Sequence, residues 1–299
     1  MAECTCETPS DKGDGGGAGR GDSTPHCGPL RAGHDAAMSG SGCVVRAFGQ
    51  TDVGLVREAN EDSFTMAELS KAQRWQGGAA AEWSTTDAGV LLVVSDGMGG
   101  AKAGEVASAL SVDAVLGGMV RAVREKAADG DTLRRVIEMA SEKVHEAGKR
   151  PDRRGMGATL TAALVVGHTA YVAQIGDSRM YLLRGGRIGQ VTHDQSYVQM
   201  LVDAGVMTPE EAEASPRKNI ILQVMGQQTV RVALGRISLK SGDRLLLCSD
   251  GLTNVVDDNT INAIAKPPGD LAKASNALVR LTKEGGAPDN VTVILAEVA

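Results

Sequence analysis

Apolar residues recur every three or four positions in three segments of the chain, which is the spacing of one face of a helix. These segments are 104–125, 132–146 and 271–283. In the second of them the spacing is carried by Leu133, Val136, Ile137, Ala140 and Val144. We predict a helix in each segment.

Short runs rich in Val, Leu and Ile, closed by Gly or Asp, predict β-strands. They lie at 90–94, 158–166, 170–175, 179–183, 187–191, 232–239, 244–249 and 291–298. Two of the predicted helices fall between the early and the middle strands. This order indicates an α+β domain in which packed sheets are covered by helices.

Three segments depart from this pattern. Residues 1–42 hold ten glycines and one branched aliphatic residue, so they cannot bury enough apolar surface to order themselves, and we predict a disordered tail followed by a folded domain at 43–299. A polar stretch at 192–226 contains a helix start at Thr208-Pro209 and is interpreted as a surface excursion. An insertion at 70–87 carries both tryptophans.

Composition narrows the possible partners. The chain of 299 residues has a net charge of −6 and only two Phe, three Tyr and two Trp, which argues against nucleic-acid binding. No aliphatic run approaches the roughly 20 residues of a membrane span, and the N-terminus has no signal-peptide pattern. We therefore expect no membrane partner and a cytoplasmic location.

Cysteine usage agrees with a reducing compartment. Four of the five cysteines lie within the first 43 residues, and an odd count without a signal peptide is typical of the cytoplasm. Cys4, Cys6, His26 and Cys27 match no known zinc-ligand spacing, so we interpret them as solvated tail residues.

Carboxylates recur where buried strands end. Segments 91–97 and 245–251 are both apolar runs that finish in Ser-Asp-Gly, which places Asp96 and Asp250 at the strand tips. A carboxylate there is costly unless a cation or hydrogen bonds satisfy it, although each Asp-Gly alone is also an ordinary turn signal. The other acids of this kind are Glu61, Asp62, Asp177 and Asp289. Because the set contains no His or Cys, it predicts a site for Mg²⁺ or Mn²⁺.

Six motifs, in this order, carry a resemblance to a known family. They are Gly54-Leu55-Val56-Arg57-x-x-Asn60-Glu61-Asp62, Asp96-Gly97-Met98-Gly99-Gly100, Gly155-Met156-Gly157-x-Thr159, Ile175-Gly176-Asp177-Ser178-Arg179, Cys248-Ser249-Asp250-Gly251-Leu252 and Asp289-Asn290-Val291-Thr292. Together they resemble the bacterial metal-dependent Ser/Thr protein phosphatases of type 2C, the PPM family. The resemblance covers residues 44–298, and it likens the excursion at 192–226 to the family's flap.

The resemblance implies a four-layer α-β-β-α sandwich, in which antiparallel helix pairs flank two central antiparallel sheets. It also implies a role for each site residue. Asp96 would bridge two Mn²⁺ or Mg²⁺ ions, with Asp250 and Asp289 completing the shell of one ion. The Gly97 carbonyl, Glu61 and Asp62 would serve the other ion, partly through water, and Asp177 would join Asp250 around a third, weaker ion.

The implied activity is hydrolysis of phosphoserine and phosphothreonine in proteins, which opposes cytoplasmic Ser/Thr kinases. Arg57 would hold the substrate phosphate, and a hydroxide bridging the ions on Asp96 would attack phosphorus. The implied partners are phosphorylated proteins, among them Ser/Thr kinases and their substrates, and we expect a monomer.

One position departs from many relatives. Eukaryotic members of the family carry His after the Asp-Gly, where this chain has Met98, which cannot donate a proton. The acid is then expected to be a metal-bound water, and His193 is interpreted as solvated. Two other functions stay open: a non-catalytic binding module on the same fold, which usually lacks one of the acids, and a two-metal nuclease, which predicts a basic groove.

Overall fold

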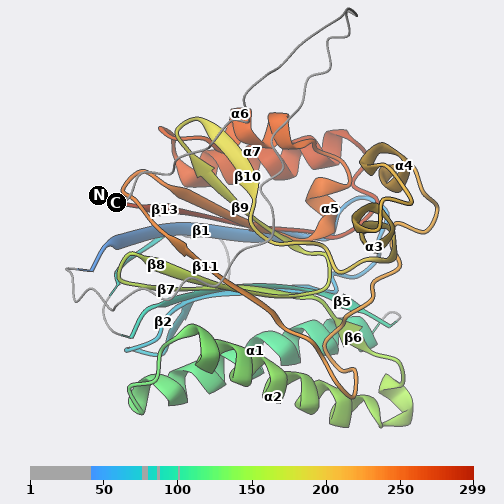
Figure 1. Cartoon of the computed structure of the whole chain (residues 1–299), viewed down its shortest axis with the longest axis horizontal. Helices are drawn as coiled ribbons and strands as arrows, with labels where there is room; N and C mark the ends of the chain where they lie inside the picture. The colour runs from blue at the N-terminus through green and yellow to red at the C-terminus, as the bar shows by residue number, and fades with distance from the viewer. Residues whose placement is uncertain (1–41, 76–79, 86–87, 100–101) are drawn as a thin grey trace, which may run out of the picture.

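Two antiparallel sheets lie face to face, and helices cover both outer faces (Figure 1). The computed structural model describes residues 42–75, 80–85, 88–99 and 102–299. The predicted tail, except Gly42, and parts of the insertion at 70–87 lie outside the described residues. Helices α1 and α2 cover one sheet, and α6 and α7 cover the other, which confirms the α-β-β-α order of layers.

The strands form two sheets of different order. The first sheet runs β10-β9-β12-β13-β1-β4 and the second runs β11-β8-β7-β5-β2-β3, with β6 paired to the end of β5. Their bounds are β1 Val44–Asp52, β2 Asp62–Glu68, β3 Gln73–Trp75, β4 Ala81–Ser84, β5 Val90–Met98, β6 Gly157–Ala158, β7 Leu160–Val166, β8 Thr169–Ile175, β9 Arg179–Arg184, β10 Arg187–Gln190, β11 Ala233–Ser238, β12 Arg244–Cys248 and β13 Val291–Val298.

The predicted helices are present within one or two residues at each end. The helices are α1 Ala103–Arg124, α2 Gly130–Gly148, α3 Tyr197–Asp203, α4 Pro209–Glu213, α5 Asp250–Thr253, α6 Asp258–Ala265 and α7 Leu271–Glu284, with a 3₁₀ turn at Pro151–Arg153. Among the described residues, α1 is the helix long and apolar enough to cross a membrane by length and composition. It packs against β5 and α2, so in this structure its apolar face contributes to the core.

The core has three layers, which explains the continuous apolar runs of the central strands. Side chains alternate between the two faces of a strand. Leu91 therefore packs toward α1 and α2, while its neighbour Leu92 packs between the sheets. Leu246 and Leu278 belong to the third layer, between the first sheet and α6 and α7. A strand buried on both faces carries no polar face, so it reads as an uninterrupted apolar run.

The strand predicted at 158–166 is divided at Thr159. The two residues of β6 pair with Gly97 and Met98, whereas β7 pairs with residues 90–94 of β5. Thr159 lies between them and forms two hydrogen bonds with Asp96. The Thr159 N–H donates to the Asp96 carbonyl, and the Asp96 N–H donates to Thr159 Oγ1. The division therefore lies directly against one of the predicted site residues.

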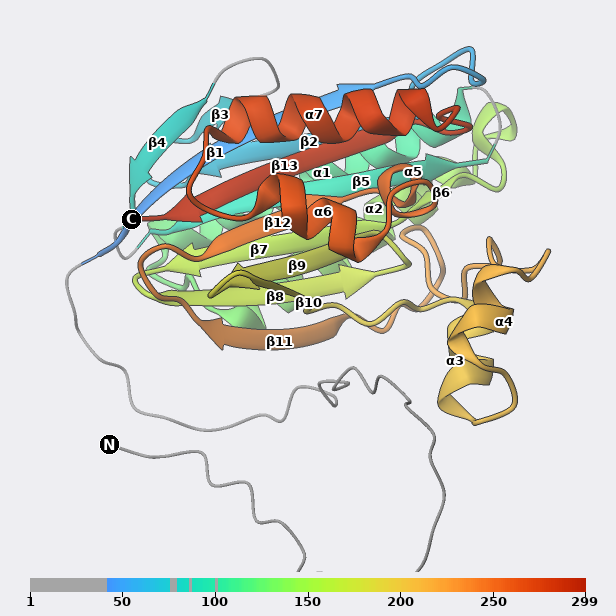
Figure 2. The ribbon, with the colours of Figure 1, turned by 90° about the horizontal axis from the view of Figure 1, so that it is seen from above.

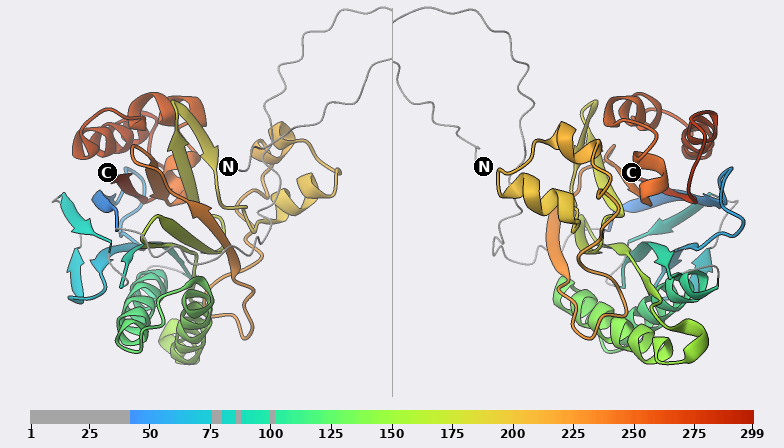
Figure 3. Two further views of the ribbon diagram at one scale, coloured as in Figure 1. Left: turned by 60° about the vertical axis from the view of Figure 1, so that its left-hand side comes forward. Right: turned by 90° about the vertical axis from the view of Figure 1, so that its right-hand side faces the viewer.

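The excursion at 192–226 folds into α3 and α4, which project from one end of the sandwich (Figures 2 and 3). Thr208 caps α4 with a capping box, as its sequence predicts, whereas α3 was not predicted. This end also holds α5, β6 and the end of β5 (Figure 1). The excursion thus lies beside the ends of the central strands.

The insertion at 70–87 adds an edge strand to each sheet, β3 to the second and β4 to the first. Its two tryptophans, Trp75 and Trp83, meet edge to face with ring centroids 5.3 Å apart. Trp83 is buried between the sheets and Trp75 packs against the same layer. The aromatic pair therefore covers one side of the central core, a role that the sequence pattern did not reveal.

Candidate active site

The second sheet brings four predicted site residues together. Strands β2 and β5 pair so that Asp62 lies opposite Asp96, and the Gly97 N–H donates to the Glu61 carbonyl at 3.1 Å. Close packing requires glycine at two positions. A Cβ on Gly97 would lie 2.2 Å from the Gly104 carbonyl oxygen, and one on Gly104 would lie 2.8 Å from Glu61 Cδ.

The first sheet supplies the remaining acids of the core. Asp250 begins α5 directly after β12, and Asp289 precedes β13, the neighbouring strand. Gly251 allows these two segments to touch, because a Cβ there would lie 1.9 Å from the Asn290 carbonyl oxygen. The charge of Asp250 raises the pKa of Asp96, so the two carboxyl groups lie near each other. The two sheets therefore meet at this pair of acids.

Two hydroxyl groups fix the side chain of Asp62, which is only 7% exposed. Ser249 Oγ and Thr292 Oγ1 each donate to Asp62 Oδ2 at 2.7 Å. Ser249 in turn accepts a hydrogen bond from the Thr292 N–H at 3.0 Å. Asp62 belongs to the second sheet, Thr292 belongs to the first and Ser249 directly follows β12 of the first, so this network joins the sheets beside the acids.

Four buried carboxylate oxygens of the predicted site lack a hydrogen-bond partner among the residues that the structure describes. They are Glu61 Oε1, Asp62 Oδ1, Asp177 Oδ1 and Asp250 Oδ1. A buried polar atom without a partner costs free energy, so such atoms in a cluster call for a ligand. All four are carboxylate oxygens, which are the ligands that Mg²⁺ and Mn²⁺ prefer. The donor set therefore fits a divalent cation.

Burial shifts these acids toward their protonated form. It raises the pKa of Asp62 to about 7, although the two hydroxyl donors oppose the shift, and it raises the pKa of Asp177 to about 8. The pKa values of Asp96, Asp250 and Glu61 are also raised, first by burial and then by neighbouring carboxylates. Asp96 and Asp250 retain some exposed surface, but protein encloses them on most sides. A nearby cation would favour the charged forms.

The acids do not form a complete metal-coordination shell in this structure. Within the described ranges, no three Asp, Glu, His or Cys side chains already surround one point closely enough to form a metal shell. Like charges repel one another, so carboxylates are expected to lie apart until a cation draws them together. The fit to a cation rests on the partnerless oxygens.

Asp177 lies in a short loop that is tied to the base of the excursion. The Gly176 N–H donates to Gln195 Oε1 at 2.8 Å, and the Gln195 N–H donates to the Gly176 carbonyl at 3.0 Å. Arg179 forms a partly buried ion pair with Asp194, at 2.7 Å between Nη2 and Oδ2. The loop that carries Asp177 and the start of the excursion therefore form one hydrogen-bonded unit.

Arg57 lies at the outer side of the acid cluster. Its Nη2 donates to Asp289 Oδ2 at 2.7 Å, and its side chain is 51% exposed. A half-exposed guanidinium beside buried acids can contact a ligand from solvent, and its planar fork suits a phosphate.

Comparisons with known proteins agree with this geometry. A family model described as protein phosphatase 2C matches residues 77–285. The chain belongs to the protein phosphatase 2C family. It is 39% identical over 264 residues to the Mycobacterium tuberculosis serine/threonine protein phosphatase PstP, covering 85% of this chain and 45% of that protein. It thus spans about half the length of that relative.

Two further members extend the comparison. Protein phosphatase PhpP of Streptococcus pneumoniae is 37% identical over 250 residues, which cover 82% of this chain and 94% of that protein. The crystal structure of the PstP catalytic domain in complex with two manganese ions superposes with a TM-score of 0.71 at 36% identity. That match covers 86% of this chain and 99% of the PstP domain.

The structure of this protein phosphatase 2C domain gathers the predicted acids at one end of the sandwich. Asp96 is central among them, because the charges of Asp62, Asp250, Asp177 and Asp289 all raise its pKa. His193 is solvated, as predicted: its side chain is 66% exposed and its Nε2 lies 2.7 Å from Asp203 Oδ2. Cys4, Cys6, His26 and Cys27 lie outside the described residues.

Asn290 is a site residue to which sequence reasoning gave no role. It is 4% exposed, its Nδ2 donates to the carbonyls of Val53 and Ala59, and its Oδ1 accepts from the Glu61 N–H. The side chain thus closes loop 53–61, which carries Arg57. Only its place in the Asp289-Asn290 motif signalled it, because these partners are more than 200 residues away.

Asn290→Ala is expected to lower the free energy of unfolding by about 1–3 kcal/mol, because it leaves three backbone groups of loop 53–61 without their partner. Urea unfolding measures this change. Asn276→Ala, the same substitution at an exposed position on α7, serves as the control and is expected to have little effect. Equal unfolding midpoints for both variants would contradict the role of Asn290.

Proposed function

We propose that this chain is a metal-dependent protein phosphatase that hydrolyses phosphoserine and phosphothreonine and opposes cytoplasmic Ser/Thr kinases. The observation that carries the proposal is the cluster of buried carboxylates with partnerless oxygens beside Arg57. The printed names of the relatives support the substrate class. The phosphorylated partner proteins, the monomeric state and the cytoplasmic location stay predictions.

The acids would hold Mn²⁺ or Mg²⁺. Asp96 would be shared by two ions, Asp250 and Asp289 would complete one site, and the Gly97 carbonyl with Glu61 and Asp62 would serve the other. Asp177 would hold a third, weaker ion together with Asp250. When bound, such cations would lower the pKa of a water and so supply a nucleophile for phosphorus near neutral pH. The PstP structure with two manganese ions supports this number of core ions.

The chain's own side chains would orient the substrate and fix the acids. Arg57 pairs with Asp289 in the structure, and the substrate phosphate would compete with that carboxylate for the guanidinium. Ser249 and Thr292 hold Asp62 in one orientation. Met98 follows Gly97 and has no proton to donate, so the leaving alkoxide must be protonated from solvent or from a bound water.

Phosphate release from a phosphothreonine peptide tests this function directly. Purified protein is expected to release phosphate with Mn²⁺ and to stop when EDTA is added in excess. A folded protein that binds Mn²⁺ but releases no phosphate would instead favour a non-catalytic binding module. Cleavage of DNA by the same preparation would favour a nuclease.

A further inference from the structure

Large apolar side chains are exposed directly before Arg57. The exposed fractions are 36% for Val53, 60% for Leu55 and 67% for Val56. Scattered exposed apolar residues need no explanation, but a group of them beside a reactive site is typical of a binding surface. Leu55 and Val56 are two residues and one residue before Arg57, whose guanidinium we assign to the substrate phosphate.

The backbone of this loop is fixed, so the exposure does not result from a loose segment. The Leu55 N–H donates to the Ala287 carbonyl at 3.0 Å, and the Gly54 N–H donates to Asp52 Oδ1 at 2.9 Å. Gly54 has φ +79°, and a Cβ there would lie 2.3 Å from the Asp289 carbonyl oxygen. Leu55 and Val56 therefore cannot turn inward without breaking these contacts.

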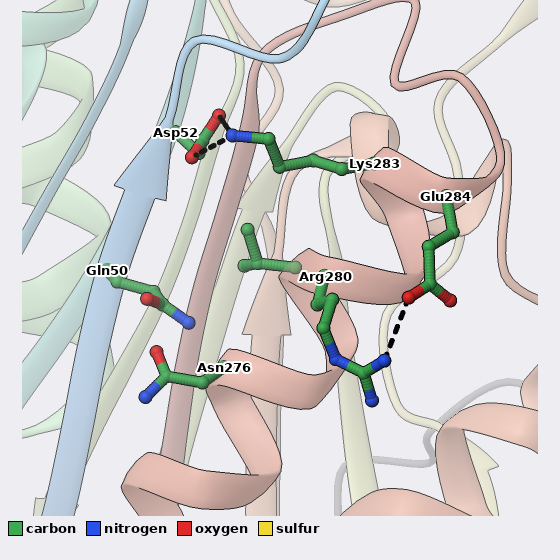
Figure 4. Close-up of a pocket in the computed structure, with 7 residues that line it drawn as sticks. Gln50, Asp52, Asn276, Arg280, Lys283 and Glu284 are labelled. Carbon is green, nitrogen blue, oxygen red and sulfur yellow. Dashed lines mark hydrogen bonds and ion pairs between the residues drawn. The ribbon is translucent and has the colours of Figure 1, made fainter.

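An ion pair with helix α7 also fixes Asp52, the residue at the start of this loop. Lys283 Nζ lies 2.9 Å from Asp52 Oδ2, at one side of a cavity of about 510 Å³ between β1 and α7 (Figure 4). The cations lining that cavity, Lys283 and Arg280, are already paired with Asp52 and Glu284. The cavity thus offers no free charge to a ligand, but its ion pair fixes the residue that caps the Gly54 turn.

We propose that Leu55 and Val56 form a docking surface for the polypeptide beside the phosphorylated residue, and that they favour substrates with a large apolar residue next to it. This inference rests on the proposed function. Successive residues of an extended peptide advance by about 3.3 Å, so a neighbour of a phosphoresidue held at Arg57 lies within reach of residues 55 and 56. Acidic neighbours are disfavoured, because the carboxylates of Asp289, Glu61 and Asp96 already lie near the same guanidinium.

Steady-state kinetics on matched substrates test the docking surface. Three phosphothreonine peptides differ only in the residues flanking the phosphothreonine, which are Leu, Ser or Glu, and 4-nitrophenyl phosphate serves as a substrate with no flanks. The wild-type chain is expected to prefer the Leu peptide. Leu55→Ser with Val56→Ser is expected to raise the KM for the Leu peptide roughly five- to tenfold, with a much smaller change on the aryl phosphate.

Met139→Ser is the matched control, because Met139 is 53% exposed but lies on α2. It is expected to keep the wild-type preference. Equal kcat/KM for all three peptides in the wild-type chain would overturn the docking surface alone. An equal loss on the aryl phosphate and the Leu peptide in the double variant would also overturn it, since it would point to a disturbed Arg57. Absence of release from every substrate would overturn the proposed function and this inference with it.

Discussion

Asp250→Asn is expected to abolish turnover while the domain stays folded. The charge of Asp250 acts on both halves of the site, because it raises the pKa of Asp96 and the pKa of Asp177. An amide cannot replace a carboxylate as an anionic metal ligand, so we expect phosphate release to fall about a thousandfold or more. Release from a phosphothreonine peptide with saturating Mn²⁺ measures the loss.

The metal-free Asp250→Asn variant is expected to melt no lower than the wild-type chain. Burial and the charge of Asp289 raise the pKa of the Asp250 carboxyl group, so its charged form is costly and the substitution removes that charge. Asn254 can still donate a hydrogen bond to the remaining oxygen. Asp258→Asn provides the control, since it makes the same change at an exposed position in the first turn of α6. Near-normal turnover in Asp250→Asn would disprove the assignment of this acid.

Lowering the pH from 8 to 5.5 is expected to stabilise the metal-free protein. Burial raises the pKa of Asp62 to about 7 and that of Asp177 to about 8, whereas in the unfolded chain an Asp titrates near about 3.9. In this pH range the folded state therefore binds more protons than the unfolded state. The free energy of unfolding must then fall as the pH rises.

The expected size of this effect is a melting temperature roughly 5–10 °C higher at pH 5.5 than at pH 8, measured in EDTA. Asp177→Asn removes one of the titrating groups and is expected to reduce the difference. Acids with lowered pKa values, such as Asp52 and Glu68, titrate below this range and do not contribute. A metal-free melting temperature that stays level or rises with pH would contradict the raised pKa values.

Mn²⁺ is expected to oppose this dependence of the melting temperature on pH. Cation binding requires charged carboxylates, so it releases protons and is stronger at high pH. The rise in melting temperature on adding Mn²⁺ is therefore expected to be larger at pH 8 than at pH 5.5. Titration calorimetry in buffers of different ionisation enthalpy counts the released protons, and no release near pH 7 would exclude protonated site acids.

Local patterns predicted most of the regular elements. The long helices α1, α2 and α7 follow a repeat of three to four residues, and eight strands, β5 and β7 to β13, follow apolar runs closed by turn residues. Local patterns do not predict strands β1 to β4 or helices α3, α5 and α6. The helix α5 has four residues, strand β1 mixes buried and exposed positions without a regular alternation, and β2 is buried or half-buried along its whole length, so it has no alternation either. Short or irregular elements give a weak local signal.

The sequence by itself determined the chemical content of the site: acids at strand ends, no His or Cys among them, an arginine nearby, and motifs in the order of the protein phosphatase 2C family. Only the tertiary structure decided how these residues meet. Asp62 lies opposite Asp96 on neighbouring strands, and its hydroxyl partners Ser249 and Thr292 are about two hundred residues further along the chain. Such partners depend on the order of strands in two sheets and on how the sheets face each other, which no local repeat encodes.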